Sequence, residues 1–135
     1  MKSLLLTFIF ASSLFSSTDW YTNYHEAMKV AQEKNKRVYM LIVSDDCRWC
    51  KKFERTTLKD KKLLRRMSSQ YVLLHLSRDS DYIPKEYKTT PIPRHYFLTS
   101  QGEEIFPVVG YRDVETFNSF LDTVDERALR MKKWD

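Results

Sequence analysis

The chain has 135 residues, of which 42% are hydrophobic and 30% are charged. This length allows one domain with a hydrophobic core and is too short for two. The formal net charge is +5, but acidic residues are interleaved with most of the basic clusters. Such interleaving is typical of solvated helix faces and argues against nucleic-acid binding.

Residues 1–17 have the pattern of an export signal, because a lysine near the start is followed by the apolar run 4–11 and then by serines. That run is too short to span a bilayer comfortably. We therefore expect a cleaved signal peptide, a periplasmic or secreted protein and a folded domain over 18–135. The cleavage site is poorly defined, either at Ala11-Ser12-Ser13 or near Ser17, and an uncleaved membrane anchor is the alternative.

The folded domain opens on a helix and a strand. Asn23 followed by Glu26 resembles a capping box, and apolar residues recur after it at helical spacing. We expect an amphipathic helix from Asn23 to about Asn35. Arg37–Ser44 is a nearly continuous apolar run, of the kind expected for a strand that is buried on both faces.

From Cys47 the sequence becomes rich in lysine, arginine and glutamate. A break near Thr56-Thr57 or Asp60 would divide this region into two helices. Tyr71–Leu76 has the pattern of a second buried strand. A polar loop and a short helix or turn around Pro84–Lys88 follow it.

The last third predicts a hairpin and a final helix. Strands over Arg94–Thr99 and Glu104–Val109 are separated by a turn that contains Gly102. Asp113 can cap a helix with an apolar stripe. The order of elements indicates an α/β fold, in which a central mixed sheet of about four strands is flanked by helices. Reaction sites in such sheets lie outside the carboxyl ends of the strands, and Cys47 follows the first strand.

Cys47 and Cys50 are the only cysteines, and they form the motif Cys47-Arg48-Trp49-Cys50. If a helix starts at Cys47, one turn brings the second sulfur beside the first. A thiolate at that place faces unpaired N–H groups and the positive end of the helix dipole. These conditions lower the pKa of a cysteine and favour redox chemistry.

Two other uses of the cysteine pair stay open. A structural zinc site needs four ligands, but His25, His75 and His95 fall on three different expected elements, so we expect no metal. A purely structural disulfide is possible, although closing a four-residue loop removes little chain entropy. Outside the cytosol a CxxC pair is either such a crosslink or a working redox couple.

From Trp20 to about Leu129 the chain resembles the thioredoxin family, in particular its exported thioredoxin-like branch. The segments that carry the resemblance are a Trp-led helix from Trp20 to Lys34, Cys47-Arg48-Trp49-Cys50-Lys51-Lys52 at the start of the next helix, Ile92-Pro93 directly before a strand, and Gly102-Glu103 in a hairpin that leads to Gly110. The resemblance implies a thioredoxin-like fold.

The resemblance also implies roles for individual residues. Cys47 would be the exposed nucleophile and Cys50 the buried resolving thiol. Pro93 would form a cis peptide bond with Ile92 and lie against the dithiol. Such a bond leaves the preceding backbone free to pair with an extended peptide, so Ile92 and Pro93 are expected to bind substrate. Pro91 is the other candidate for the cis bond, and a strand-edge proline is the plainer alternative for Pro93.

Between the cysteines stands Arg-Trp, where thioredoxins have Gly-Pro and strong oxidants have Pro-His, so the redox potential cannot be copied from either. Arg48 adds a positive charge that should lower the pKa of the neighbouring thiolate. Trp49 is expected to contact the substrate or to shield Cys50, with a place in the core as the alternative.

Other positions also depart from the family pattern. Leu41 stands six residues before the first cysteine, where thioredoxins have a buried acid that helps proton transfer. Asp45 and Asp46 are expected to face solvent, where Asp46 would raise the pKa of the cysteine beside it. Arg94 would either select acidic or bulky partners or lie at the rim of the site. His95 is expected to be a packed strand residue and not a proton shuttle.

We therefore expect an exported thiol-disulfide oxidoreductase that reduces or interchanges disulfides in cysteine-containing proteins. It would be a monomer with no cofactor other than the Cys47–Cys50 disulfide, and a reductase outside the cytosol would need a membrane electron donor. One alternative is a non-catalytic thioredoxin-fold module that binds a partner or a soft metal such as Cu(I) at the CxxC. The other is a dithiol oxidase, although the larger exported oxidases carry an inserted helical domain for which this chain has no room.

Overall fold

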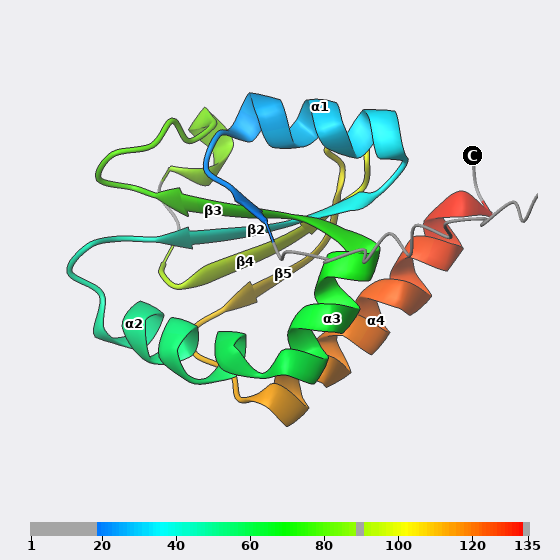
Figure 1. Cartoon of the computed structure of the whole chain (residues 1–135). Helices are drawn as coiled ribbons and strands as arrows, with labels where there is room; N and C mark the ends of the chain where they lie inside the picture. The colour runs from blue at the N-terminus through cyan, green and yellow to red at the C-terminus, as the bar shows by residue number, and fades with distance from the viewer. Residues whose placement is uncertain (1–18, 89–90, 134–135) are drawn as a thin grey trace, which may run out of the picture.

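The computed structural model describes residues 19–88 and 91–133, so the expected signal segment over 1–17 lies outside the described residues. A five-stranded mixed sheet forms the centre of the molecule, in the order β1-β3-β2-β4-β5. Helices cover both faces of this sheet (Figure 1). The expected α/β fold with a central mixed sheet is thereby confirmed.

After β1, the longer elements follow the expected order along the chain. The strands are β1 (Trp20–Tyr21), β2 (Arg37–Val43), β3 (Tyr71–Ser77), β4 (Arg94–Leu98) and β5 (Glu104–Val109). The helices are α1 (Tyr24–Lys34), α2 (Arg48–Arg55), α3 (Lys61–Gln70) and α4 (Val114–Lys132), with 3₁₀ turns η1 (Thr57–Lys59) and η2 (Lys85–Tyr87).

One expectation about the first element was wrong. Trp20 does not lead the first helix but belongs to β1, where it pairs in parallel with Leu73 of β3. This strand has only two residues, so no sequence period could reveal it. The helix itself begins at Tyr24, after Asn23.

The helices begin where short polar side chains can accept a hydrogen bond from the first turn. Asn23 Oδ1 accepts from the backbone N–H of Glu26 at 3.0 Å, and Asp113 Oδ1 accepts from that of Thr116 at 2.8 Å. Asp60 likewise caps α3, so η1 and Asp60 together make the expected break between α2 and α3. Local sequence therefore sets the helix starts.

The two faces of the sheet carry separate cores, because successive side chains of a strand point to opposite faces. Tyr39, Leu41 and Val43 of β2 pack with residues of α2, α3 and α4. The intervening Val38 and Met40 pack with α1 on the other face. In Figure 1, α1 lies above the sheet and α2 to α4 lie below it.

The central strand β2 leads directly to the cysteine motif. It pairs in parallel with β3 and in antiparallel with β4, and the pair Ile42–Arg94 places the start of β4 beside the end of β2. The loop after β2 and the loop before β4 therefore meet at one end of the sheet. Within residues 19–88 and 91–133, no helix has the length and apolar character needed to cross a membrane.

Candidate active site

Cys47 and Cys50 are joined by a disulfide at the start of α2. Cys47 is the N-cap of the helix, and its Sγ accepts a hydrogen bond from the backbone N–H of Cys50 at 3.2 Å. The expected helix start at Cys47 is confirmed. Cys47 is 8% exposed and Cys50 is 1% exposed, so Cys47 is the more accessible member of a largely covered pair.

The peptide bond between Ile92 and Pro93 is cis, and β4 begins directly after it. Pro93 is buried, and its carbonyl oxygen accepts a hydrogen bond from the backbone N–H of Gly110 at 2.8 Å. Ile92 packs against both cores. The hydrogen bond between Gly110 and Pro93 ties the end of β5, and with it Tyr111, to the loop before β4.

An exposed group of aromatic and basic side chains lies on the first turn of α2 and on the segment after β5. We call Arg48, Trp49, Lys52 and Tyr111 the cation–aromatic cluster. Lys52 Nζ lies 5.1 Å from the ring centre of Trp49 and 4.7 Å from that of Tyr111, while Arg48 Cζ lies 5.2 Å from the Trp49 ring. The ring centres of Trp49 and Tyr111 are 6.0 Å apart. Trp49 is 46% exposed, so it does not occupy the core.

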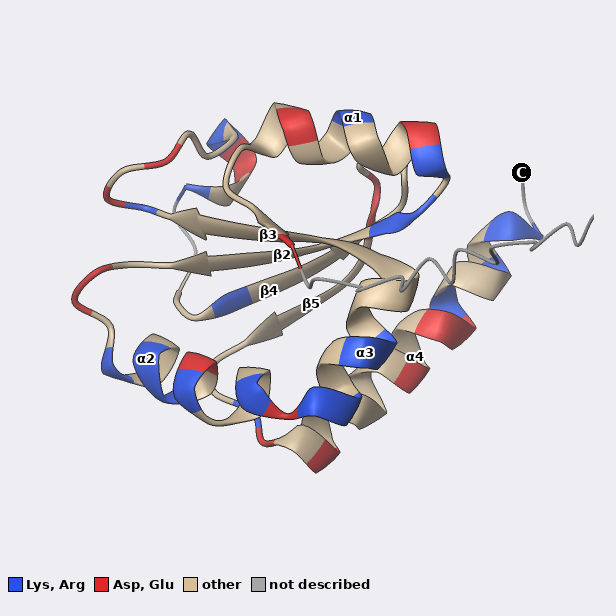
Figure 2. Ribbon diagram, in the orientation of Figure 1, with Lys and Arg blue, Asp and Glu red and all other residues tan. Residues whose placement is uncertain are grey.

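Positive charge predominates on α2 (Figure 2). Arg48, Lys51, Lys52 and Arg55 all lie on this helix. Its acidic residue, Glu54, contacts His75 Nε2 through Oε1 at 2.6 Å. Among the described residues no carboxylate forms an ion pair with the four basic side chains.

Acidic loops lie on the other side of Cys47. The backbone N–H of Asp45 donates to Asp79 Oδ2 at 2.6 Å, and Ser77 Oγ donates to Asp45 Oδ1 at 3.2 Å. Asp45 and Asp46 are both exposed, as expected from the sequence. The disulfide therefore stands between an acidic loop pair and the basic helix α2.

The face of the sheet that α2 covers carries an apolar residue where thioredoxins have a buried acid. Leu41 is fully buried, and its register partners are His75 on β3 and His95 on β4. The pair formed by Glu54 and His75 is partly exposed. No local sequence pattern indicates this pair, because it joins a helix to a strand 21 residues away.

His95 is a packed residue of the core, as expected. Its Nε2 contacts the carbonyl oxygen of Gly110 at 2.9 Å, and its Nδ1 lies 2.7 Å from the hydroxyl of Tyr39. A carbonyl can only accept, so Nε2 carries the proton and Nδ1 accepts from Tyr39. Burial lowers the pKa of His95 from its usual 6.5 to about 4. At neutral pH the ring is therefore uncharged, with both nitrogens satisfied inside the protein.

Arg94 directly follows the cis-proline at the start of β4, and its side chain lies on the α1 face of the sheet. Its register partner Ile42 belongs to the core on the α1 face of the sheet, and its guanidinium lies 5.0 Å from the ring centre of Tyr96. Strand alternation turns Arg94 away from α2, whereas His95 points toward it. The basic residues on the α2 side of the sheet next to the disulfide belong to α2 itself.

No group of three or more His, Cys, Asp or Glu side chains within 19–88 and 91–133 has the arrangement of a metal site. The histidines are apart from one another: His25 stacks on Tyr82, whereas His75 contacts Glu54 and His95 contacts Tyr39.

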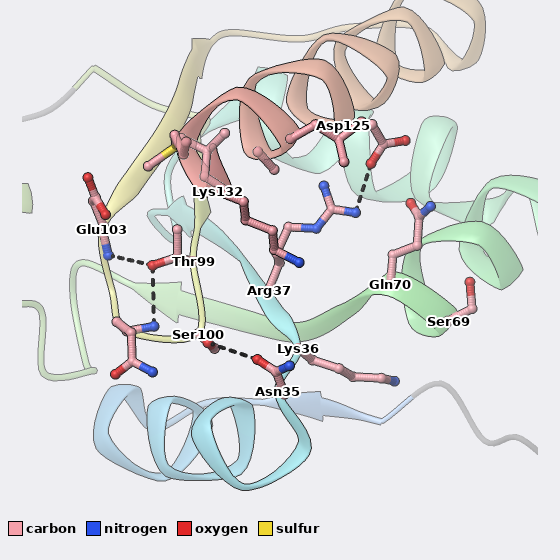
Figure 3. A pocket seen from close by; sticks show the side chains of 15 residues that line it. Asn35, Lys36, Arg37, Ser69, Gln70, Thr99, Ser100, Glu103, Asp125 and Lys132 are labelled. Carbon is pink, nitrogen blue, oxygen red and sulfur yellow. Dashed lines mark hydrogen bonds and ion pairs between the residues drawn. The ribbon is translucent and has the colours of Figure 1, made fainter. Parts of the chain in front are cut away.

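A hollow lies at the end of β2 opposite the disulfide, and no cysteine lines it. We call it the distal pocket; it measures about 570 Å³. Its wall includes Arg37 at the start of β2, residues of the β4–β5 turn and the end of α4. Figure 3 shows Arg37 reaching across it toward Asp125, and Arg37 Nη2 lies 2.7 Å from Asp125 Oδ1.

A CxxC disulfide at the start of a helix, on a mixed sheet with a cis-proline beside the same end, defines a thioredoxin-fold protein. The chain belongs to the thioredoxin-like domain family, whose sequence model matches residues 24–125. No curated protein sequence matches the chain.

Solved structures with this fold include redox proteins. A thioredoxin from Thermus thermophilus is 24% identical, with a TM-score of 0.67 over 78% of this chain and 85% of its own. A putative disulphide-isomerase from Bacteroides thetaiotaomicron is 20% identical, with a TM-score of 0.69 over 82% and 93%. The oxidised C-terminal domain of Neisseria meningitidis DsbD is 18% identical, with a TM-score of 0.58 over 76% and 97%. At these identities the similarity shows the fold.

Proposed function

We propose that the protein is a thiol-disulfide oxidoreductase that reduces or interchanges disulfides in other proteins. The observation that carries this proposal is the Cys47–Cys50 disulfide at the N-terminus of α2, at the end of the sheet where the cis-proline loop also lies. A disulfide in that place closes a loop too short to stabilise the fold much. Its position suits chemistry better than crosslinking.

The reaction exchanges one disulfide for another through a mixed disulfide. In the reduced protein, the Cys47 thiolate attacks one sulfur of the substrate disulfide. The substrate bond breaks, and its other sulfur leaves as a thiolate that takes up a proton. Cys50, after losing its proton, attacks Cys47 Sγ, forms the Cys47–Cys50 bond and releases the second substrate thiol. Two electrons pass to the substrate, and a dithiol donor must then reduce the protein again.

The geometry supports separate roles for the two cysteines. Cys47 is the less buried of the two cysteines, and it is the N-cap of α2. Unpaired N–H groups at a helix N-terminus stabilise a thiolate, and Arg48 adds a positive charge next in sequence. Cys50 is almost fully buried, which suits an internal resolving thiol. Ile92, Pro93 and Trp49 are the proposed contacts for the substrate.

We also propose that the protein works outside the cytosol as a monomer, with residues 1–17 as the export signal and a membrane protein as electron donor. The apolar N-terminal run and the pairing of both cysteines support this placement. The disulfide itself is the proposed redox group, with no further cofactor.

Trapping the mixed disulfide tests the proposed reaction. Cys50→Ser should form a stable adduct with a disulfide-containing protein such as insulin, visible by mass spectrometry, because Cys47 can attack but nothing resolves the product. Cys47→Ser should form no adduct. Equal adduct formation by the two variants, or none by either, would contradict the proposal.

The direction of electron flow is tested by equilibrating the wild-type dithiol with glutathione. A low reduction potential is the result expected for a reductase, and a high potential would favour a dithiol oxidase instead.

A further inference from the structure

The cation–aromatic cluster has a charge arrangement that is unfavourable within the protein alone. Arg48 and Lys52 are four residues apart on α2, so they lie on one face of the helix. Like charges at this spacing destabilise a helix. Within the described part of the chain neither forms an ion pair, and both are exposed. The repulsion would be relieved by an anion from outside.

The rings hold these cations in fixed places. Lys52 Nζ lies over the pair of rings formed by Trp49 and Tyr111, at 5.1 and 4.7 Å from their centres. Tyr111 in turn follows Gly110, whose N–H donates to Pro93. A lysine on a bare helix loses much side-chain freedom when it binds an anion, but a lysine whose ammonium group already contacts two rings loses less. The cluster is therefore prepared for a ligand.

The surroundings determine on which side of the disulfide an anion would bind. Asp45, Asp46 and Asp79 make the opposite side acidic and exposed. Arg48, directly after Cys47, begins the basic side. A polypeptide that brings a cysteine to Cys47 would thus place carboxylates over α2 and keep them away from the loop after β2.

From this geometry we propose that the protein selects substrates whose reactive cysteine is flanked by an acidic segment, with carboxylates paired to Lys52 and Arg48 beside Trp49. The inference rests on the proposed disulfide exchange and names its substrate class. Charge complementarity of this kind raises association rates and excludes partners of the wrong sign. It accounts for two aromatic rings left partly exposed next to the disulfide.

Two peptides that differ only in charge test this proposal. Each carries one internal disulfide, flanked by Asp and Glu in the first and by Asn and Gln in the second. The reduced protein should reduce the acidic peptide faster, with a ratio of rate constants that falls as salt is raised. Lys52→Gln should lower that ratio by a factor of about 1.5 to 5, the effect of one exposed ion pair.

Lys51→Gln is the matched control, because it removes the same charge from the next residue of the helix. Lys51 is exposed and makes no contact with either ring, so its removal should leave the ratio nearly unchanged. An equal fall in both variants would overturn the proposal in favour of a diffuse effect of helix charge. A ratio near one between the rate constants of the wild-type protein for the acidic and the neutral peptide would also overturn the proposal.

Glutathione disulfide, used as a third substrate, distinguishes binding of a small anion from binding of an acidic polypeptide segment. If Lys52→Gln slowed only glutathione disulfide and neither peptide, the docking of an acidic segment would be refuted. Failure to reduce either peptide, together with no insulin adduct for Cys50→Ser, would instead refute the proposed function and the inference with it.

Discussion

The two ends of the central sheet differ in whether their charged side chains form ion pairs within the protein. At the disulfide end, Arg48 and Lys52 lie over aromatic rings and no described carboxylate pairs with them. At the distal pocket, Asp125 of α4 contacts both Arg37 and Arg66, at 2.7 and 3.3 Å. Charges at the distal end hold α4 to the sheet, whereas those at the disulfide end stay available to a partner.

The difference extends to what lies beneath each end. Under α2 the support is apolar and aromatic: Phe53 is fully buried, with its ring 4.8 Å from that of His95 and 5.4 Å from that of Phe117. At the distal end a hollow of about 570 Å³ remains, and ion pairs span its side. The comparison indicates that packing holds both α2 and α4 on the sheet, and that the ion pairs of Asp125 add to this packing at the distal end.

The largest expected effect tests the apolar support of the disulfide. Phe53→Ala should lower the free energy of unfolding by about 3–5 kcal/mol, because it leaves a cavity in a closed core. Urea denaturation measures the change. Leu129→Ala is the control at the other end: Leu129 is exposed, so its truncation should change stability by less than about 0.5 kcal/mol. Equal effects of the two changes would break the comparison.

A smaller effect on stability is expected from pH, and it sharpens the comparison of the two ends because it arises from His95 in the core next to α2. Burial holds the folded-state pKa of His95 at about 4, below its usual 6.5, so between these values the unfolded chain binds a proton that the folded protein does not. Stability should fall as pH drops from about 6.5 to about 4, by roughly 3 kcal/mol in total. Denaturation at several pH values should show this slope, and His95→Gln should reduce it.

His25→Gln serves as the control for that measurement. His25 is exposed on α1, where it stacks on Tyr82, so its replacement should leave the slope unchanged. A slope that survives His95→Gln intact would show that another group responds to the acid.

The smallest expected effect concerns the ion pairs of the distal end. Asp125→Asn should cost about 1–2 kcal/mol, because it leaves two partly buried guanidinium groups with weaker partners. Asp122→Asn should cost less than about 1 kcal/mol, because Asp122 is largely exposed and contacts Arg66 alone. High salt should shrink both losses. Losses that are equal and independent of salt would contradict a role for charge at this end.

Much of the architecture could be predicted from the sequence, because it depends on local interactions. The helix starts at Asn23 and Asp113 follow from side chains that cap the next turn. The apolar run of β2 predicts a strand buried on both faces. The helix start at Cys47 follows from its place between that strand and a helix-forming segment, so the position of the disulfide could also be predicted.

Other features were decided by the tertiary structure, because they join segments that are distant in the chain. Tyr111 completes the ring pair that Lys52 contacts only because β5 ends beside the loop before β4. The register of β4 against β2 places the Arg94 side chain on the α1 face of the sheet. The short strand β1 exists through its pairing with β3 alone. The sequence by itself thus determined the longer elements and the position of the cysteine pair. The fold decided which charges and rings surround that pair, since such contacts depend on register and packing and not on local pattern.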